Sequence, residues 1–342
     1  MPLAVAAAVL FGVSTPIAKA LLGDFPPVGL AGLLYLGSGL GLLVLTVLRR
    51  ATGVATEAPI RRGDLPWLGA VVLAGGVVGP VLLMTGLAAT AASTASLLLN
   101  LEGLFTLGIA WVIFRENVDL RIGLGAGAIL LGAALLSWTG HAGGVNWGAL
   151  AIVGACVAWG IDNNLTRKLS AADPVQLAMI KGLAAGVFNT ALGLSRASAW
   201  PPVSAIATAM AVGFFGYGVS LVCFILALRH LGTARTGAYF SLAPFAGASV
   251  AVLVFSESVT PVFVVAAALM VVGVYLHLAE RHDHQHTHEP MSHEHRHVHD
   301  AHHQHTHGPD DPPGEPHTHR HDHPRLAHSH PHYPDIHHRH DH

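Results

Sequence analysis

Charged residues are scarce in this sequence. Asp, Glu, Lys and Arg make up 11% of its 342 residues, whereas they make up about a quarter of an average soluble domain. The 14 Lys or Arg and 10 Asp or Glu of residues 1–281 fall mostly in short clusters. The apolar stretches between these clusters are about 20 residues long, which is the length that spans a bilayer. The pattern excludes an ordinary soluble fold and predicts membrane-spanning helices.

Cysteine and catalytic motifs are also scarce. Cys156 and Cys223 are the only cysteines and both lie in apolar runs, so neither a disulfide framework nor a Cys-x-x-Cys site is predicted. The sequence lacks a phosphate-binding glycine motif, a nucleophile elbow and an HExxH segment, and its loops are short, which argues against an enzyme. A formal net charge of −2 gives no basic footprint for a nucleic acid partner.

Apolar windows bounded by charged or turn residues predict ten spans. The first window lacks a basic segment before it and many spans follow, so it is predicted to be a retained helix rather than a signal peptide. The predicted fold class is an all-α integral membrane protein of ten transmembrane helices surrounded by membrane lipid. The windows lie near residues 3–22, 28–48, 65–87, 92–114, 120–138, 147–167, 174–195, 204–228, 234–255 and 260–279.

Basic residues gather in the links on one side of the predicted bundle. The opposite links contain only Lys19 and Arg196. Because loops rich in Lys and Arg face the cytoplasm, the bias predicts a multi-pass protein of the cytoplasmic (inner) membrane with both termini in the cytoplasm. The eleven residues of the basic side are Arg49, Arg50, Arg61, Arg62, Arg115, Arg121, Arg167, Lys168, Arg229, Arg235 and Arg281.

The first half of the chain is similar to the second. At a shift of 141 residues, ASLLLNLEGLFTLGIAWVIFRE, which ends at Glu116, aligns with TGAYFSLAPFAGASVAVLVFSE, which ends at Glu257. At a shift of 148, FGVSTPIAK from Phe11 aligns with WGIDNNLTR from Trp159. Each half would hold five helices, an odd number, so the halves are predicted to insert in opposite directions, as in alternating-access transporters. The predicted units are residues 2–138, residues 147–280 and a tail, 281–342.

The repeated segments resemble those of the drug/metabolite transporter superfamily and its EamA-like members. The resemblance covers residues 2–280 and rests on the FG…P.AK, WG…TRK, LNLEGLFT…FRE and FSLAPFAG…FSE segments. It implies a ten-helix exporter or exchanger of small metabolites that does not hydrolyse ATP, and it does not identify the solute. The commoner pattern has a proline in the fourth helix, but this sequence has Gly103 there. The corresponding position in the ninth helix has the usual proline, Pro244.

Polar side chains within the predicted spans are the functional candidates. Burying a charged one in hydrocarbon costs about 2.5–3.5 kcal/mol on insertion scales, so it normally faces a cavity or a partner. Glu102 is predicted to be a protonatable carboxylate that couples proton entry to solute exit. The alternative is a structural role, either an ion pair with Lys181 or a hydrogen bond to the Asn cluster. The predicted pathway and coupling residues are Asn100, Glu102, Asp162, Asn163, Asn164, Lys181 and Tyr239.

Three other acidic residues near or within the spans have structural alternatives of their own. Asp162 lies close along the chain to Arg167 and Lys168, so a position near the lipid headgroups is the alternative to a place in the pathway. Glu116 and Glu257 lie at the ends of spans and are expected to cap or anchor helices rather than to contact solute.

The tail repeats His-x-His and holds 23 of the 26 histidines. It has no periodic apolar face, so it is predicted to be disordered. Neutral imidazole is a good ligand for Zn, Ni, Cu and Co ions, and binding of such ions is predicted. The candidate ligands are His282, His284, His286, His288, His293, His295, His297, His299, His302, His303, His305, His307, His317, His319, His321 and His323.

Three functions are open for the whole chain. The leading prediction is an exporter or exchanger of a small metabolite or drug-like solute with an accessory metal-binding tail, because the spans contain no His or Cys pair to escort a metal ion. The alternatives are a divalent metal (Ni, Co or Zn) exporter and a non-transporting metal store or sensor. Transport itself is predicted to need no cofactor. Protons or a counter-solute, and a second copy in a homodimer, are the other expected partners.

Overall fold

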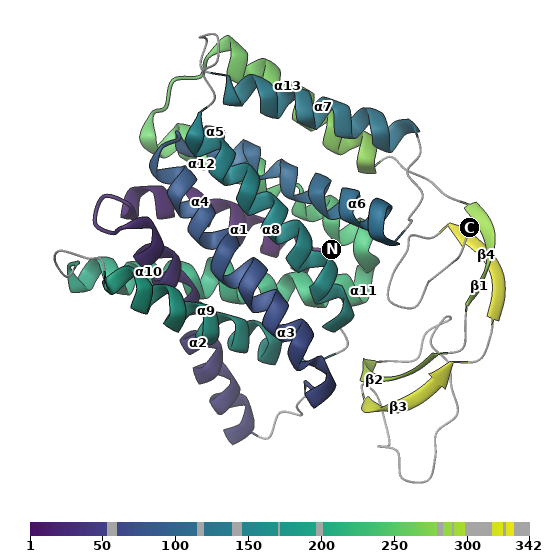
Figure 1. Ribbon diagram of the computed structural model, residues 1–342. Helices are drawn as coiled ribbons and strands as arrows, with labels where there is room; N and C mark the ends of the chain where they lie inside the picture. The colour runs from purple at the N-terminus through teal and green to yellow at the C-terminus, as the bar shows by residue number, and fades with distance from the viewer. Residues whose placement is uncertain are drawn as a thin grey trace.

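Helices make up nearly all of the described membrane part of the chain. The computed structural model describes residues 1–52, 60–114, 120–138, 146–169, 172–195, 201–278, 283–288, 291–297, 317–323 and 326–331. The helices, shown in Figure 1, are α1 (Pro2–Leu21), α2 (Pro27–Ala51), η1 (Arg62–Asp64), α3 (Leu65–Val71), η2 (Val72–Val78), α4 (Gly79–Ala88), α5 (Ala92–Leu98), α6 (Asn100–Phe114), α7 (Leu120–Ser137), α8 (Trp147–Leu169), α9 (Pro174–Leu194), α10 (Val203–Gly213), η3 (Phe214–Val219), α11 (Ser220–Phe240), α12 (Ala243–Phe255) and α13 (Pro261–Leu278).

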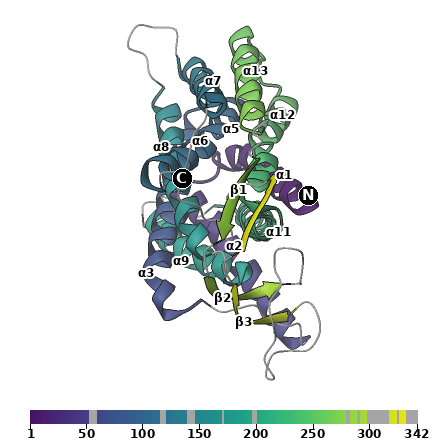
Figure 2. The same cartoon turned by 90° about the vertical axis from the view of Figure 1, so that its right-hand side faces the viewer.

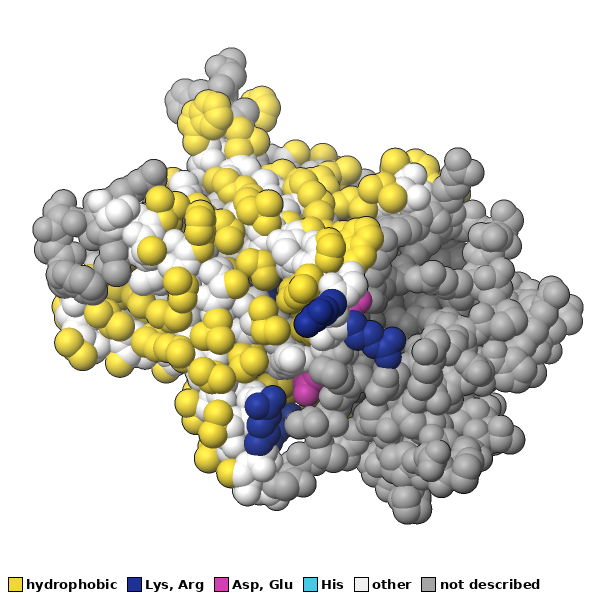
Figure 3. All heavy atoms as spheres, turned by 60° about the horizontal axis from the view of Figure 1, so that its bottom comes forward, with side chains coloured by type: hydrophobic (Ala, Val, Ile, Leu, Met, Phe, Trp, Pro, Cys, Tyr) yellow, Lys and Arg dark blue, Asp and Glu magenta, His cyan; other side chains and the backbone are white. Residues whose placement is uncertain are grey.

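Eight helical segments of the described chain are long and apolar enough to cross a membrane. Two further apolar helices, Ala243–Phe255 and Pro261–Leu276, are shorter. Apolar side chains cover most of the described surface on the face in Figure 3, as expected where lipid surrounds the helices. The membrane part of the chain is therefore all-α and multi-pass, as predicted, while the count of ten spans and the inverted repeat stay predictions.

The chain bends sharply within α11. The ring centroids of Phe224 and Phe240 lie 4.8 Å apart, although sixteen residues of straight helix rise about 24 Å. The bend lies between Phe224 and Phe240, where the boundary between the eighth and ninth spans is predicted. The ninth span is itself interrupted between α11 and α12, at Ser241 and Leu242, just before Pro244.

The fourth span is interrupted as well. α5 ends at Leu98 and α6 begins at Asn100, which lie 142 residues before the end of α11 and 143 residues before the start of α12. The proline that accompanies the break in the ninth span has no counterpart here, since Gly103 takes its place. The two halves therefore share a helix break at matching positions, and α6 and α12 both start within a predicted span.

Close helix packing depends on glycine at the contact between α2 and α9. A Cβ added to Gly32 would overlap backbone atoms of Thr190, and one added to Gly182 would overlap those of Gly39. α1 packs on α11 and α12, whereas α8 packs on α4 and α6. α7 and α13 lie side by side at the top of both views (Figures 1 and 2). Small residues thus bring the helices that carry the buried polar side chains close together, as expected in membranes.

The structure describes four short strands in the tail, whose predicted disorder stays a prediction. β1 (Asp283–His288) pairs antiparallel with β4 (Leu326–Pro331), and β2 (Met291–His297) pairs antiparallel with β3 (His317–His323). Alternation of His with other residues has the period of a strand, and the ladders satisfy the backbone groups of these segments. In β2 and β3 the register pairs His293 with His321 and His295 with His319.

Candidate functional site

Glu102 lies in the first turn of α6, directly after the break at Leu99. A carboxylate is favoured at this position, because the first N–H groups of a helix have no partner in the helix and the dipole is positive there. The Glu102 side chain is partly exposed. The amide of Asn163 in α8 donates to Glu102 Oε1 at 2.9 Å and to Thr106 Oγ1 at 3.2 Å. Among the described residues, no cation pairs with Glu102.

Asp162 and Lys181 form a buried ion pair between α8 and α9. Lys181 Nζ lies 2.5 Å from Asp162 Oδ2, and both side chains are almost fully buried. Thr166, one turn along α8, donates to the other carboxylate oxygen at 3.4 Å. The predicted alternative of a Glu102–Lys181 pair is therefore wrong, and the Asp162 side chain is buried against α9 rather than exposed at the surface.

The helical rotation of α8 explains this pairing. Successive residues of a helix point about 100° apart, so the adjacent Asp162 and Asn163 face different neighbours. Asp162 faces α9, whereas Asn163 faces Glu102 in α6. The two acidic groups thus have different surroundings, because one is neutralised by a cation and the other contacts only neutral groups.

A π-helical turn provides the room and the acceptors around this pair. In η2 the Gly75 carbonyl accepts from the Tyr35 hydroxyl at 2.6 Å and from the Trp159 indole N–H at 3.0 Å. A Cβ at Gly75 would overlap the Asp162 carboxylate. The neighbouring Gly76 carbonyl accepts from the Asn189 amide at 3.1 Å. π-helical turns occur often at functional sites, and here the turn joins α2, α8 and α9.

A second π-helical turn, η3, begins 142 residues after η2. It carries Tyr217, whose ring centroid lies 5.8 Å from that of Phe11 and 5.4 Å from that of Tyr35. Phe11 also contacts Trp159, at 5.9 Å. The Tyr217 hydroxyl is buried beside Ser14. These aromatic side chains connect the two halves of the chain beside the ion pair.

The remaining predicted pathway residues have structural contacts or lie apart. The Asn100 amide donates to the Leu97 carbonyl at 2.9 Å and thereby satisfies an acceptor freed by the break. The Asn164 amide donates to the carbonyls of Gly160 and Thr106, which ties α8 to α6. Tyr239 lies at the end of α11, one residue before the helix ends. The structure thus places Glu102 against Asn163 and Asp162 against Lys181. The seven predicted residues do not form one cluster of mutual contacts.

Sequence reasoning missed Thr106, Tyr35 and Trp159 as members of this region. Thr106 follows Glu102 by four residues, which places both on one face of the helix, and this spacing was a usable signal. Tyr35 and Trp159 have no such signal, because aromatic side chains in membrane helices most often serve packing. Both side chains donate to the Gly75 carbonyl, a contact that only the structure could reveal.

The described side chains provide no metal centre. Among them, no group of three or more His, Cys, Asp or Glu is placed to hold an ion. Ten of the predicted ligands fall in β1, β2 and β3, whose backbone alone is described: His284, His286, His288, His293, His295, His297, His317, His319, His321 and His323. The other six, His282, His299, His302, His303, His305 and His307, lie outside the described residues.

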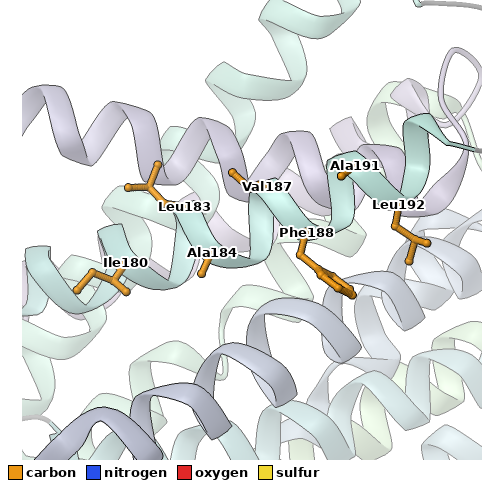
Figure 4. Close-up of a pocket in the computed structure, with 7 residues that line it drawn as sticks. All are labelled: Ile180, Leu183, Ala184, Val187, Phe188, Ala191 and Leu192. Carbon is orange, nitrogen blue, oxygen red and sulfur yellow. The ribbon is translucent and has the colours of Figure 1, made fainter. Parts of the chain in front are cut away.

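A groove along α9 is an unsuitable place for a polar solute. It has a volume of about 810 Å³ and is lined only by apolar side chains of that helix, among them Ile180, Val187 and Phe188. Figure 4 shows these side chains spread along the helix, with no polar group among them to orient a ligand. In a membrane such a face suits lipid chains. The polar cluster around Glu102 remains the better candidate site.

Comparisons with known proteins agree on one family. The EamA-like transporter family matches residues 1–138 and again residues 146–279. An uncharacterised transporter of Methanothermobacter thermautotrophicus is 29% identical over 80% of this chain and 84% of its own length. A probable terminal-alkyne amino-acid exporter of Streptantibioticus cattleyicolor is 28% identical over 73% of this chain and 86% of its own length. One crystal structure, 20% identical, has a TM-score of 0.62 and covers 81% of this chain and 97% of its own; this likeness shows the fold alone.

Proposed function

The chain belongs to the EamA-like transporter family, and from this premise we propose that it exports or exchanges a small organic solute by a cycle that protonates and deprotonates Glu102. The family and the transporter relatives make it a membrane transporter of small solutes. The observation that carries the coupling step is the environment of Glu102. Its carboxylate lies at a helix start within a span and contacts an amide, while the nearby ammonium of Lys181 is held by Asp162.

The same environment favours a solute with an amino group. A carboxylate without a cationic partner binds either a proton or an ammonium, and the two compete for it. Export then follows if protons entering from the outer side displace the solute. The relative that is a probable amino-acid exporter supports a zwitterion of the amino-acid class. No metal ligand set is described beside Glu102, so this proposal ranks above metal export.

Cells that overproduce the protein should release an amino-bearing solute that null cells retain. An untargeted comparison of the media from null, overproducing and Glu102→Gln cells identifies it, since the variant should resemble the null. The Asp24→Asn variant changes a carboxylate in a short link and should resemble the wild type. Media that do not differ, together with greater nickel, cobalt or zinc resistance, would instead favour the metal exporter.

The two halves are proposed to be inverted repeats, with both termini in the cytoplasm. Support comes from the two separate family matches, the helix breaks at matching positions and the π-helical turns 142 residues apart. The orientation rests on the basic links. Figure 3 shows Lys and Arg side chains gathered at one edge of the apolar face. Reporter fusions at Ser170 and Ser198 check this arrangement, because they should report opposite sides of the membrane.

The tail is proposed to be an accessory metal-binding segment rather than part of the transport pathway. Deleting residues 282–342 removes 23 of the 26 histidines, so the purified protein should lose most of its binding of Ni or Zn ions, measured by calorimetry. The truncated protein should still insert and transport solute, since the residues of the candidate site all precede the tail. Loss of insertion on truncation would show instead that the tail is structural.

A further inference from the structure

Two charged side chains meet the short link between α4 and α5, residues 89–91, from different halves of the chain. The ammonium of Lys19, near the end of α1, donates to the carbonyls of Leu87 and Ala88 at 2.6 and 3.3 Å. These carbonyls end α4. The carboxylate of Glu257, which follows α12, accepts from the N–H groups of Ala92 and Ser93 at 2.9 and 3.0 Å. These N–H groups begin α5.

Each charge has the sign that its helix end favours. A cation is stabilised at a helix C-terminus and an anion at a helix N-terminus, and both side chains also satisfy backbone groups that have no partner within the helix. The expectation that Glu257 caps a helix is confirmed, although the helix belongs to the other half of the chain. Lys19 and Glu257 also attract each other electrostatically. We call these two residues, with the link, the α4–α5 clamp.

The backbone before Glu257 is shaped for this contact. Ser256 has a φ of 51°, and it is the only described residue other than glycine in the left-handed region. Such a conformation costs about 1–3 kcal/mol and persists where the surroundings hold it. It ends α12 and turns the chain so that Glu257 reaches back to α5. The segment between α12 and α13 is therefore tied to the fourth span by this carboxylate.

The clamp covers buried polar groups. Thr90 lies in the link, Ser93 and Ser96 lie in α5, and all three are at most 5% exposed. The hydroxyls of Thr90 and Ser96 have no hydrogen-bond partner. Gly148, in the first turn of α8, packs directly against Thr90 of the link, since a Cβ at Gly148 would overlap the Thr90 hydroxyl. Buried hydroxyls without partners cost free energy, so a state in which water reaches them is stabilised relative to the closed one.

We infer that the α4–α5 clamp is the gate at this end of the bundle, and that Lys19 and Glu257 release the link when the pathway opens there. The two caps belong to different halves, so a movement of α12 away from α5 breaks the Glu257 contacts and frees the link. Water then reaches Ser93 and Ser96. The basic links predict that this end faces outward. The inference needs only that the protein is a transporter, and it does not depend on the solute or on Glu102.

Thiol labelling tests the gate in membrane vesicles. In a background with Cys156→Ala and Cys223→Ala, Ser96→Cys is the reporter and a membrane-impermeant thiol reagent is the probe. Loss of one cap should shift the closed-to-open ratio and raise the labelling rate about fivefold. Lys19→Met and Glu257→Gln should each do so, and Lys19→Arg should not. Ala89→Cys lies exposed on the link, and its labelling in right-side-out or inverted vesicles shows which side the clamp faces.

The control removes a helix cap elsewhere. Asp64 accepts from the Arg61 N–H at the start of η1, at 3.0 Å, so Asp64→Ala removes a capping contact without touching the link and should leave the labelling of Ser96→Cys unchanged. If Lys19→Met does not fold, judged by size-exclusion profile, Glu257→Gln decides alone. Unchanged labelling in a folded Glu257→Gln variant would overturn the gate and leave the clamp a static pair of caps.

Discussion

Replacing Glu102 by Gln is expected to abolish proton-driven solute transport while solute exchange without a gradient survives. Glutamine has nearly the same shape and can still accept the hydrogen bond from Asn163, so the contact between α6 and α8 remains. It cannot bind and release a proton. Accumulation in proteoliposomes with an imposed pH gradient should therefore fall to the level of empty vesicles, whereas exchange of labelled for unlabelled solute should continue.

The outcome separates coupling from binding. If Glu102 binds only the proton, Glu102→Gln loses accumulation alone. If it also binds the ammonium of the solute, exchange falls as well, and the apparent affinity for the solute falls with it. Asp24→Asn serves as the matched control, because it makes the same chemical change in an exposed link. Accumulation by Glu102→Gln at the wild-type level would remove Glu102 from the mechanism.

The apolar windows predicted the fold well, because the length of a span is set by the bilayer. They could not predict where spans are interrupted. The break at Leu99 has no proline to indicate it, whereas the break at Ser241 and Leu242 stands beside Pro244. The π-helical turns also have no signature beyond paired glycines, because a glycine pair in a span more often serves close packing. The Gly75 and Gly76 carbonyls became recognisable as acceptors only once Tyr35 and Asn189 were placed.

The candidate site was predictable in its members and not in its pairs. Glu102, Asp162 and Lys181 stand out because a charge within an apolar run needs a partner. Which charge meets which depends on the rotation of each helix about its axis, and one residue along α8 changes the facing direction by about 100°. The alternative that paired Glu102 with Lys181 was wrong for this reason. The hydrogen bond from the Asn cluster to Glu102, the other alternative, is present.

The ion pair of Asp162 and Lys181 makes the second large prediction. Lys181→Met should leave a buried carboxylate without its cation, and Asp162→Asn should leave a buried ammonium without its anion. Removing one partner of a buried pair costs about 3–5 kcal/mol, so either variant should unfold at a markedly lower temperature or lower denaturant concentration. The double variant contains neither charge and should recover much of the loss, because asparagine fits beside Gly75 as aspartate does.

Comparison with the other acidic residue makes this prediction specific. Mutations of side chains that contact each other show coupling energies of about 0.5–3 kcal/mol, whereas those of independent sites add. Unfolding measurements on Asp162→Asn, Lys181→Met and their double variant should therefore show strong coupling. In the corresponding set of Glu102→Gln, Lys181→Met and their double variant, the changes in unfolding free energy should add, since Glu102 contacts Asn163 and not Lys181. The reverse pattern would mean that Lys181 pairs with Glu102 in the membrane, and the proton would then have to be exchanged at Asp162.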